Sequence, residues 1–138
     1  MSERYYFDTS IWLDFLENRD EPNMPKSEWA RKLVMKIINK KDKILISGAV
    51  KNELIGVGYS KYEIETLFRP FQNYILEVYT SKKQYGKAKD LKNKRKVPFL
   101  DALHAVLARD NKAVIVTRDL HFNKLLDITE YKKPEELI

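Results

Sequence analysis

Two short apolar runs constrain the fold more than any other feature of this sequence. Residues 44–46 read Ile-Leu-Ile and residues 113–116 read Ala-Val-Ile-Val, and neither run alternates with polar residues. A strand that is apolar on both sides belongs in a mostly parallel sheet with helices on both faces. Two further β-prone runs, at 5–7 and 74–79, add strands to this predicted sheet.

Amphipathic segments between these runs predict the covering helices. Residues 99–107 have apolar side chains at helical spacing and give the clearest pattern. Capping boxes that begin at Ser60 and Ser81 predict helices that end near Phe68 and Asn93. The remaining expected elements are a helix over 11–19, a helix capped by Ser27, a helix over 49–55, one or two helical turns over 120–126 and an edge strand that begins at Ile128.

These elements predict an α/β fold with three layers (α/β/α) and a mostly parallel sheet of four or five strands. The chain has 138 residues, a length that suits one domain with a single core. No repeat or linker divides the sequence. We therefore expect a single domain over residues 1–138.

The composition excludes several kinds of site. The chain has no cysteine, which excludes a disulfide scaffold, a cysteine nucleophile and a thiolate zinc site. The N-terminal residues lack the apolar segment of a signal peptide, and no apolar run approaches the ~20 residues of a membrane span. We expect a cytoplasmic protein without a membrane partner. The net charge of +6 favours a polyanionic partner, although a lysine-rich thermophilic surface gives the same charge.

Four acidic residues lie next to the predicted strands and helices: Asp8, Glu53, Asp101 and Asp119. Asp8 follows the strand at 5–7, and Asp119 follows the strand at 113–116. Glu53 lies in the helix after the strand at 44–46, and Asp101 lies near the start of the helix over 99–107. In open α/β sheets, sites form beyond the carboxyl ends of the strands. Converging carboxylates without cysteine suit Mg²⁺ or Mn²⁺, which removes their mutual repulsion and lowers the pKa of a bound water. Taken alone, each acid is better explained as an ordinary turn or helix-capping residue, and only their joint placement favours a metal site.

The segments that hold these acids resemble the motifs of PIN-domain nucleases, in the family's order. They read Tyr6-Phe7-Asp8-Thr9-Ser10, Val50-Lys51-Asn52-Glu53-Leu54, Leu100-Asp101-Ala102-Leu103-His104-Ala105 and Val116-Thr117-Arg118-Asp119. The resemblance covers nearly the whole chain and implies that the four acids are catalytic metal ligands. It also implies that neighbouring hydroxyl groups orient carboxylates or phosphate, namely those of Thr9, Ser10 and Thr117; their alternative role is helix capping.

The resemblance implies a Mg²⁺- or Mn²⁺-dependent endoribonuclease that cleaves RNA by metal-activated water. By analogy with small prokaryotic PIN proteins, the chain resembles the toxin of a VapBC-type toxin–antitoxin pair. The expected partners are then RNA, a small antitoxin whose helix fills an apolar groove, and a second copy of the chain in a homodimer. Trp12, Phe15 and Trp29 are candidates for the groove, and core packing explains them as well.

Several polar residues near the motifs have less certain roles. The segment Lys82–Lys96 is strongly basic, so we expect RNA contacts from Lys94, Arg95 and Lys96, or else a solvated helix. Arg118, beside Asp119, is expected to bind phosphate or to pair with an acid. His104 stands where the family is often aliphatic, so we assign it to packing or to the surface. A structural role is expected for His121.

Three other functions stay open on the sequence alone. The first is a PIN nuclease of RNA maturation or decay that has no antitoxin. The second is a non-catalytic RNA-binding module, against which the four intact acids argue. The third is a metal-dependent phosphatase of small molecules, which the basic segment and the absence of a capping domain disfavour.

Overall fold

The computed structural model describes residues 2–138 and is built on one five-stranded sheet with the order β3-β2-β1-β4-β5. Every neighbouring pair of strands is parallel. The strands are β1 (Arg4–Phe7), β2 (Lys43–Ser47), β3 (Ile75–Val78), β4 (Val114–Val116) and β5 (Tyr131–Lys132). The predicted parallel sheet is confirmed.

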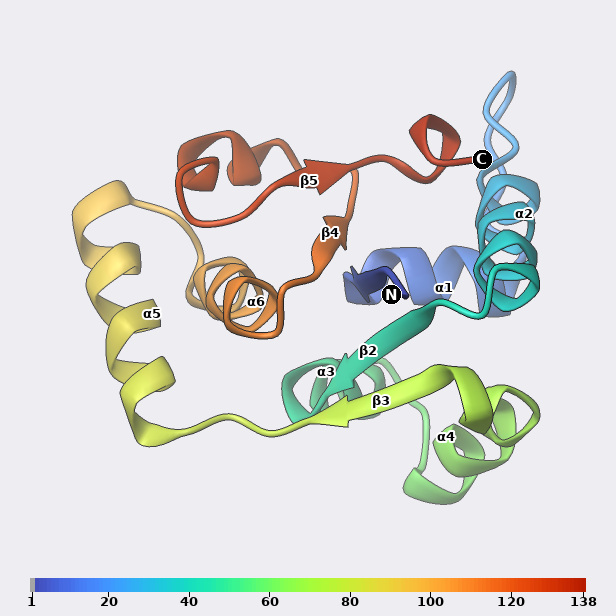
Figure 1. Ribbon diagram of the computed structural model, residues 1–138, viewed down its shortest axis with the longest axis horizontal. Coiled ribbons are helices and arrows are strands. Elements are labelled where there is room, and N and C mark those ends of the chain that lie inside the picture. Colours follow the sequence, from blue (N-terminus) through green and yellow to red (C-terminus); the bar gives the residue numbers. More distant parts are fainter. Residues whose placement is uncertain (1) are drawn as a thin grey trace.

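Six α-helices connect and cover these strands. They are α1 (Thr9–Glu17), α2 (Lys26–Asn39), α3 (Gly48–Gly56), α4 (Lys61–Phe68), α5 (Lys82–Arg95) and α6 (Phe99–Asp110). Right-handed crossovers place α1 to α4 on one face of the sheet and α5 and α6 on the other. Figure 1 shows α5 and α6 on one side of the strands and α2 and α4 on the opposite side. The three-layer α/β/α fold is therefore confirmed.

Three 3₁₀ helices complete the chain: η1 (Arg69–Tyr74), η2 (Leu120–Leu125) and η3 (Pro134–Glu136). The turn after β4 is therefore helical, as expected for this segment. Both capping boxes are present, at Ser60 before α4 and at Ser81 before α5. Each serine accepts a hydrogen bond from a backbone amide three residues on, which explains why these helices begin where the sequence predicts.

The core explains why the two apolar runs lack polar alternation. Ile44, Leu45 and Ile46 of β2 are all buried, and so are Ile115 and Val116 of β4, because helices cover both faces of the sheet. The middle helix α6 is buried from Ala102 to Ala108. No helix among residues 2–138 has the length and apolar content that a bilayer crossing requires.

The direction in which strands are added to the sheet reverses between β1 and β4. From β1 the sheet grows toward β2 and β3, whereas β4 and β5 lie on the other side of β1. Helices then diverge from the carboxyl ends of these two central strands and leave a crevice, the usual ligand site of an open α/β sheet. Asp8 follows β1 and Thr117 follows β4, so both stand at this crevice.

Two of the expected element boundaries are wrong. Helix α2 begins at Lys26, and Ser27 is not its cap: the Ser27 amide and hydroxyl both donate to Asp20 Oδ1 at 2.8 Å. The carboxylate of Asp20, in the preceding loop, therefore takes the capping role expected for the Ser27 side chain. The last strand begins at Tyr131, since the amide of Ile128 closes a turn onto the carbonyl of Leu125.

The aromatic residues proposed for an apolar groove mostly belong to the core. Trp12 is buried, with its ring between those of Phe7 and Phe68 at centroid distances of 5.0 and 4.7 Å. Phe15 is half-buried against the same cluster. Trp29 is half-buried with the guanidinium of Arg118 5.4 Å from its ring centroid. The core alternative therefore holds for Trp12, and Trp29 is covered by an arginine.

Candidate active site

Asp8 is aimed into the crevice by the end of β1. Its amide donates to the carbonyl of Val116 at 3.1 Å, which extends the ladder between β1 and β4 by one residue. The side chain precedes α1 but makes no capping hydrogen bond. Instead, Asp8 Oδ2 accepts from Thr117 Oγ1 at 2.8 Å and from Ser10 Oγ at 3.3 Å. Two hydroxyl groups thus orient the carboxylate of Asp8, which does not cap α1.

Thr117 couples the two central strands at the site. Its side chain is buried, and its Oγ1 accepts from the amide of Asp119 at 3.1 Å while it donates to Asp8. One hydroxyl therefore fixes the carboxylate after β1 and the turn after β4. The orienting role expected for Thr117 stays a prediction, and this contact is the geometry that it requires.

A tight group of three side chains lies beside Asp8. Asp101 from the first turn of α6, Asp119 and His121 each offer a ligand atom, and these atoms lie within 4.8 Å of one another. His121 Nδ1 is 3.0 Å from Asp101 Oδ2 and 3.0 Å from Asp119 Oδ1. Asp119 Oδ1 also accepts from the backbone amide of His121 at 2.9 Å, which starts η2. His121 is therefore part of the site, which the structural role expected from the sequence missed.

The surroundings of Asp101 make its ionisation costly. Burial is the largest cause that raises its pKa, and the nearby charges of Asp119 and Asp8 raise it further, to about 6. The hydrogen bond from His121 acts in the opposite direction. A carboxyl group crowded by like charges is the state that a bound cation relieves.

Glu53 reaches the same pocket from α3. Its Oε1 accepts from Thr9 Oγ1 at 2.9 Å and lies 2.9 Å from His104 Nε2. Burial tends to raise the pKa of Glu53, but its hydrogen bond and electrostatic interaction with His104 and the hydrogen bond from Thr9 outweigh burial, and the pKa lies below its usual value. Glu53 is therefore held in its ionised form.

All four predicted acids line one pocket of about 690 Å³. The predicted residues Thr9 and Ser10 and the basic Arg118 line it as well, with an apolar wall from α1 and the end of α3. The lining residues are Asp8, Thr9, Ser10, Leu13, Glu53, Gly56, Val57, Asp101, Arg118 and Asp119. The structure thus brings together residues that are widely separated in the sequence.

Arg118 is the basic side chain of this pocket, and it is held from behind. Its Nη1 donates to both carboxylate oxygens of Glu135, at 2.7 and 2.9 Å, and the guanidinium stacks on Trp29. Its Nε and Nη2 are shielded from solvent and make no hydrogen bond within residues 2–138. Sequence reasoning missed Glu135, which lies in the C-terminal tail.

The other basic residues expected to contact RNA stand outside the pocket. Lys94 and Lys96 are exposed at the end of α5, and Arg95 forms an ion pair with Asp127. The lining of the acidic pocket contains no residue of α5. Any contact of Lys94, Arg95 or Lys96 with RNA would therefore involve nucleotides beyond the pocket.

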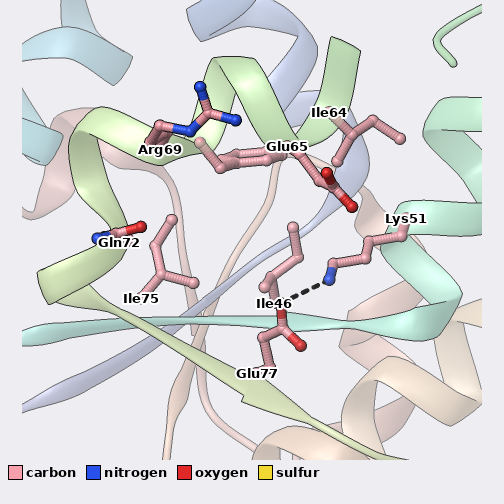
Figure 2. A pocket seen from close by; sticks show the side chains of 9 residues that line it. Ile46, Lys51, Ile64, Glu65, Arg69, Gln72, Ile75 and Glu77 are labelled. Atoms are coloured by element: carbon pink, nitrogen blue, oxygen red, sulfur yellow. Dashed lines mark hydrogen bonds and ion pairs between the residues drawn. The ribbon is translucent and has the colours of Figure 1, made fainter. Parts of the chain in front are cut away.

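A second pocket lies between α3, α4, η1, the edge strand β3 and its neighbour β2. It has a volume of about 370 Å³ and an apolar floor that includes Ile46 and Ile64. Figure 2 shows Lys51 at its rim pointing toward Glu77, whose Oε1 lies 2.7 Å from Lys51 Nζ. None of the site residues predicted from the sequence lines this second pocket.

The donor set of the acidic pocket fits a hard divalent cation. Carboxylate oxygens dominate, one imidazole stands at the margin, and the chain has no thiol. Such a set suits Mg²⁺ or Mn²⁺ better than the softer metals. The pKa of Asp101, raised by burial and then by the charges of Asp119 and Asp8, agrees with a need for a compensating cation.

Comparison with known proteins gives matches in sequence family and in fold. Residues 5–126 match the family model described as PIN domain. No curated protein sequence matches the chain. Three solved structures have similar folds: VapBC2 from Rickettsia felis bound to a promoter DNA fragment (TM-score 0.68, 20% identity, 94% of this chain and 98% of that chain covered), VapBC-1 from nontypeable Haemophilus influenzae (0.66, 20%, 96% and 98%) and FitAcB from Neisseria gonorrhoeae (0.62, 18%, 96% and 99%).

Proposed function

Since this chain belongs to the PIN-domain family, we propose that it is a Mg²⁺- or Mn²⁺-dependent endoribonuclease. The observation that carries the proposal is the convergence of Asp8, Glu53, Asp101 and Asp119 on one pocket at the switch point of the sheet. Three of them approach closely enough for the charges of Asp8 and Asp119 to raise the pKa of Asp101. This crowding favours a bound cation.

The carboxylates of Asp8, Asp101 and Asp119, together with that of Glu53, would hold the metal. When bound, a divalent ion supplies Lewis-acid stabilisation of a phosphoryl oxygen and lowers the pKa of a coordinated water. The chain itself fixes the ligands: Thr117 and Ser10 hold Asp8, and His121 holds Asp101 and Asp119. These contacts keep the carboxylates preoriented, which removes a cost of reorganisation.

Arg118 gives the pocket a positive group for an RNA phosphate. Glu135 and Trp29 hold the guanidinium, and its Nε and Nη2 are shielded from solvent, so Arg118 would act on the phosphate through its positive charge. A positive charge beside the acids attracts an anionic phosphodiester without a direct hydrogen bond. The expected role is to position the phosphodiester beside the acids. Basic residues of α5, including Lys94 and Lys96, would then contact the RNA outside the pocket.

We also propose that the chain is the toxin of a VapBC-type pair that acts in the cytoplasm as a homodimer. Support comes from the similar folds of VapBC2 and VapBC-1 and of a toxin–antitoxin complex from Klebsiella pneumoniae. Co-expression with the product of a neighbouring small gene tests the partner. A stable complex with suppressed cleavage supports the toxin assignment, and the lack of such a gene product favours an RNA maturation or decay nuclease.

The cleavage activity is tested with a labelled RNA in Mg²⁺ or Mn²⁺, with and without EDTA. The wild type should cut RNA only when the ion is present, and Asp101→Asn should abolish cutting. Asp90→Asn makes the same chemical change at an exposed position of α5 and should leave cutting intact. Equal cutting by wild type and Asp101→Asn, or cutting in EDTA, would contradict the proposal.

A further inference from the structure

A series of hydrogen-bonded side chains runs from the acidic pocket into the core. Glu53 Oε1 lies 2.9 Å from His104 Nε2, His104 Nδ1 lies 2.6 Å from the hydroxyl of Tyr6, and that hydroxyl lies 2.7 Å from Ser47 Oγ. His104 is 1% exposed, and Tyr6 and Ser47 are fully buried. The structural role expected for His104 thus includes two specific polar partners.

The three buried members of this hydrogen-bonded series come from three elements that meet in the centre of the fold. Tyr6 belongs to β1, Ser47 ends β2 and caps α3, and His104 lies in the buried middle of α6. The neighbours of His104 along α6 are apolar, from Ala102 to Ala108. A polar group in such surroundings is costly unless each of its hydrogen bonds is made. An aliphatic residue would pack here without any such requirement.

Counting donors and acceptors assigns the direction of every hydrogen bond in this series. The amide of Val50 donates to Ser47 Oγ at 3.2 Å. If His104 is neutral with its proton on Nε2, Ser47 donates to Tyr6, Tyr6 donates to His104 Nδ1, and His104 donates to Glu53. If His104 instead donated from Nδ1, either as the other neutral tautomer or with both nitrogens protonated, the Tyr6 proton would go to Ser47, and the Ser47 proton would find no acceptor in these contacts. The first arrangement satisfies every group.

At the pocket end of this hydrogen-bonded series, Glu53 is held through one carboxylate oxygen only. Oε1 receives both the Thr9 hydroxyl, at 2.9 Å, and the His104 ring. Within residues 2–138, no hydrogen bond is made to Glu53 Oε2. The carboxylate is therefore held in one rotamer with its second oxygen left for another ligand, and Glu53 lines the acidic pocket.

We propose that His104 is a positioning residue that holds Glu53 for the divalent cation, and that Tyr6 and Ser47 fix the tautomer that does so. The inference rests on the proposed function, because Glu53 has a cation to receive only if the pocket binds one. Partners that orient a metal-binding carboxylate commonly change metal affinity by about 10–100-fold when they are removed.

The test uses three variants of the full chain, with Mn²⁺ alone as the probe. His104→Leu removes the donor to Glu53, and His104→Gln restores an amide N–H near the position of Nε2. Tyr6→Phe keeps the aromatic ring and removes the hydroxyl. Thr129→Val is the matched control, since Thr129 is buried but lies outside the pocket. Circular dichroism checks that each variant is folded.

Mn²⁺ affinity, measured by electron paramagnetic resonance, should fall about 10–100-fold in His104→Leu. It should recover to within about tenfold of the wild-type value in His104→Gln and stay at that value in Thr129→Val. With RNA, kcat should fall and KM should stay constant in His104→Leu. Unchanged Mn²⁺ affinity in folded His104→Leu would reduce His104 to a packing residue and overturn the proposal.

Nitrogen-15 NMR of the metal-free protein tests the tautomer without any activity. Wild-type His104 should give the pattern of a neutral ring protonated at Nε2, and Tyr6→Phe should shift it toward a mixture of tautomers. A wild-type ring protonated at Nδ1 would overturn the assigned direction even if a variant fails to fold. If the wild type binds Mn²⁺ but cuts no RNA, only the proposed function is contradicted. If it binds no Mn²⁺, both the proposed function and the positioning role of His104 are contradicted.

Discussion

Replacing Asp101 with asparagine should stabilise the metal-free protein while it removes a metal ligand. The pKa of Asp101 rises from 3.8 to about 6 because the carboxyl group is buried and lies near Asp119 and Asp8. At about 1.4 kcal/mol per pH unit, ionised Asp101 costs about 3 kcal/mol at neutral pH. The group borders an open pocket where solvent screens its charge, so we expect a gain of about 1–2 kcal/mol in the variant.

The sign of the pH dependence follows from the direction of this pKa change. A raised carboxyl pKa means that the folded state binds the proton more tightly than the unfolded chain does. The penalty is therefore absent below about pH 4, grows toward about pH 6 and is constant above it. Metal-free wild type should lose stability across this interval, and Asp101→Asn should be spared that part of the loss.

Urea unfolding in EDTA at about pH 4 and about pH 7.5, followed by circular dichroism, measures this difference. The variant should have the higher midpoint at the upper pH and nearly the wild-type midpoint at the lower one. The exposed change Asp90→Asn should shift neither midpoint. If Asp101→Asn is less stable than wild type at the upper pH, or gains equally at both, the electrostatic reasoning fails.

Three other perturbations separate metal binding from RNA binding. Thr117→Val removes the 2.8 Å hydrogen bond to Asp8 and should weaken Mn²⁺ binding about tenfold by isothermal titration calorimetry; an unchanged Kd would refute the orienting role. Arg118→Gln should raise KM for RNA several-fold and leave the Mn²⁺ Kd unchanged, and a loss of Mn²⁺ binding would contradict a role in phosphate attraction. Mn²⁺ affinity should decrease as the pH falls through about 6, because the proton competes with the ion for Asp101. Affinity that is constant from about pH 5 to about pH 7 would argue against this competition.

Most of the fold could be predicted because its strands and helices depend on short segments of sequence, such as apolar runs and capping boxes. The apolar runs at 44–46 and 113–116 are buried in strands β2 and β4, and the capping boxes at Ser60 and Ser81 start helices. The boundary at Ser27 failed because the decisive acceptor, Asp20, comes from the preceding loop. Pattern and propensity contain no information about such a partner.

The acids of the site were predictable because each occupies a defined place relative to a strand or helix. Their common pocket follows from the parallel topology, which brings the carboxyl ends of β1 and β4 side by side. His121 and Glu135 were missed because their roles depend on tertiary contacts, with Asp101 and with Arg118. The polar role of His104 was hidden for the same reason, since Tyr6 and Glu53 are far away in the sequence.

The central claim is that acids from separate segments form one cation site at the switch point of the sheet. Anomalous X-ray diffraction from crystals soaked in manganese chloride tests it most directly, because Mn²⁺ is located without assumptions about activity. The account predicts an anomalous peak in contact with the carboxylates of Asp101 and Asp119 and beside Asp8. The lack of a peak in that pocket, with or without a peak elsewhere on the molecule, would contradict it.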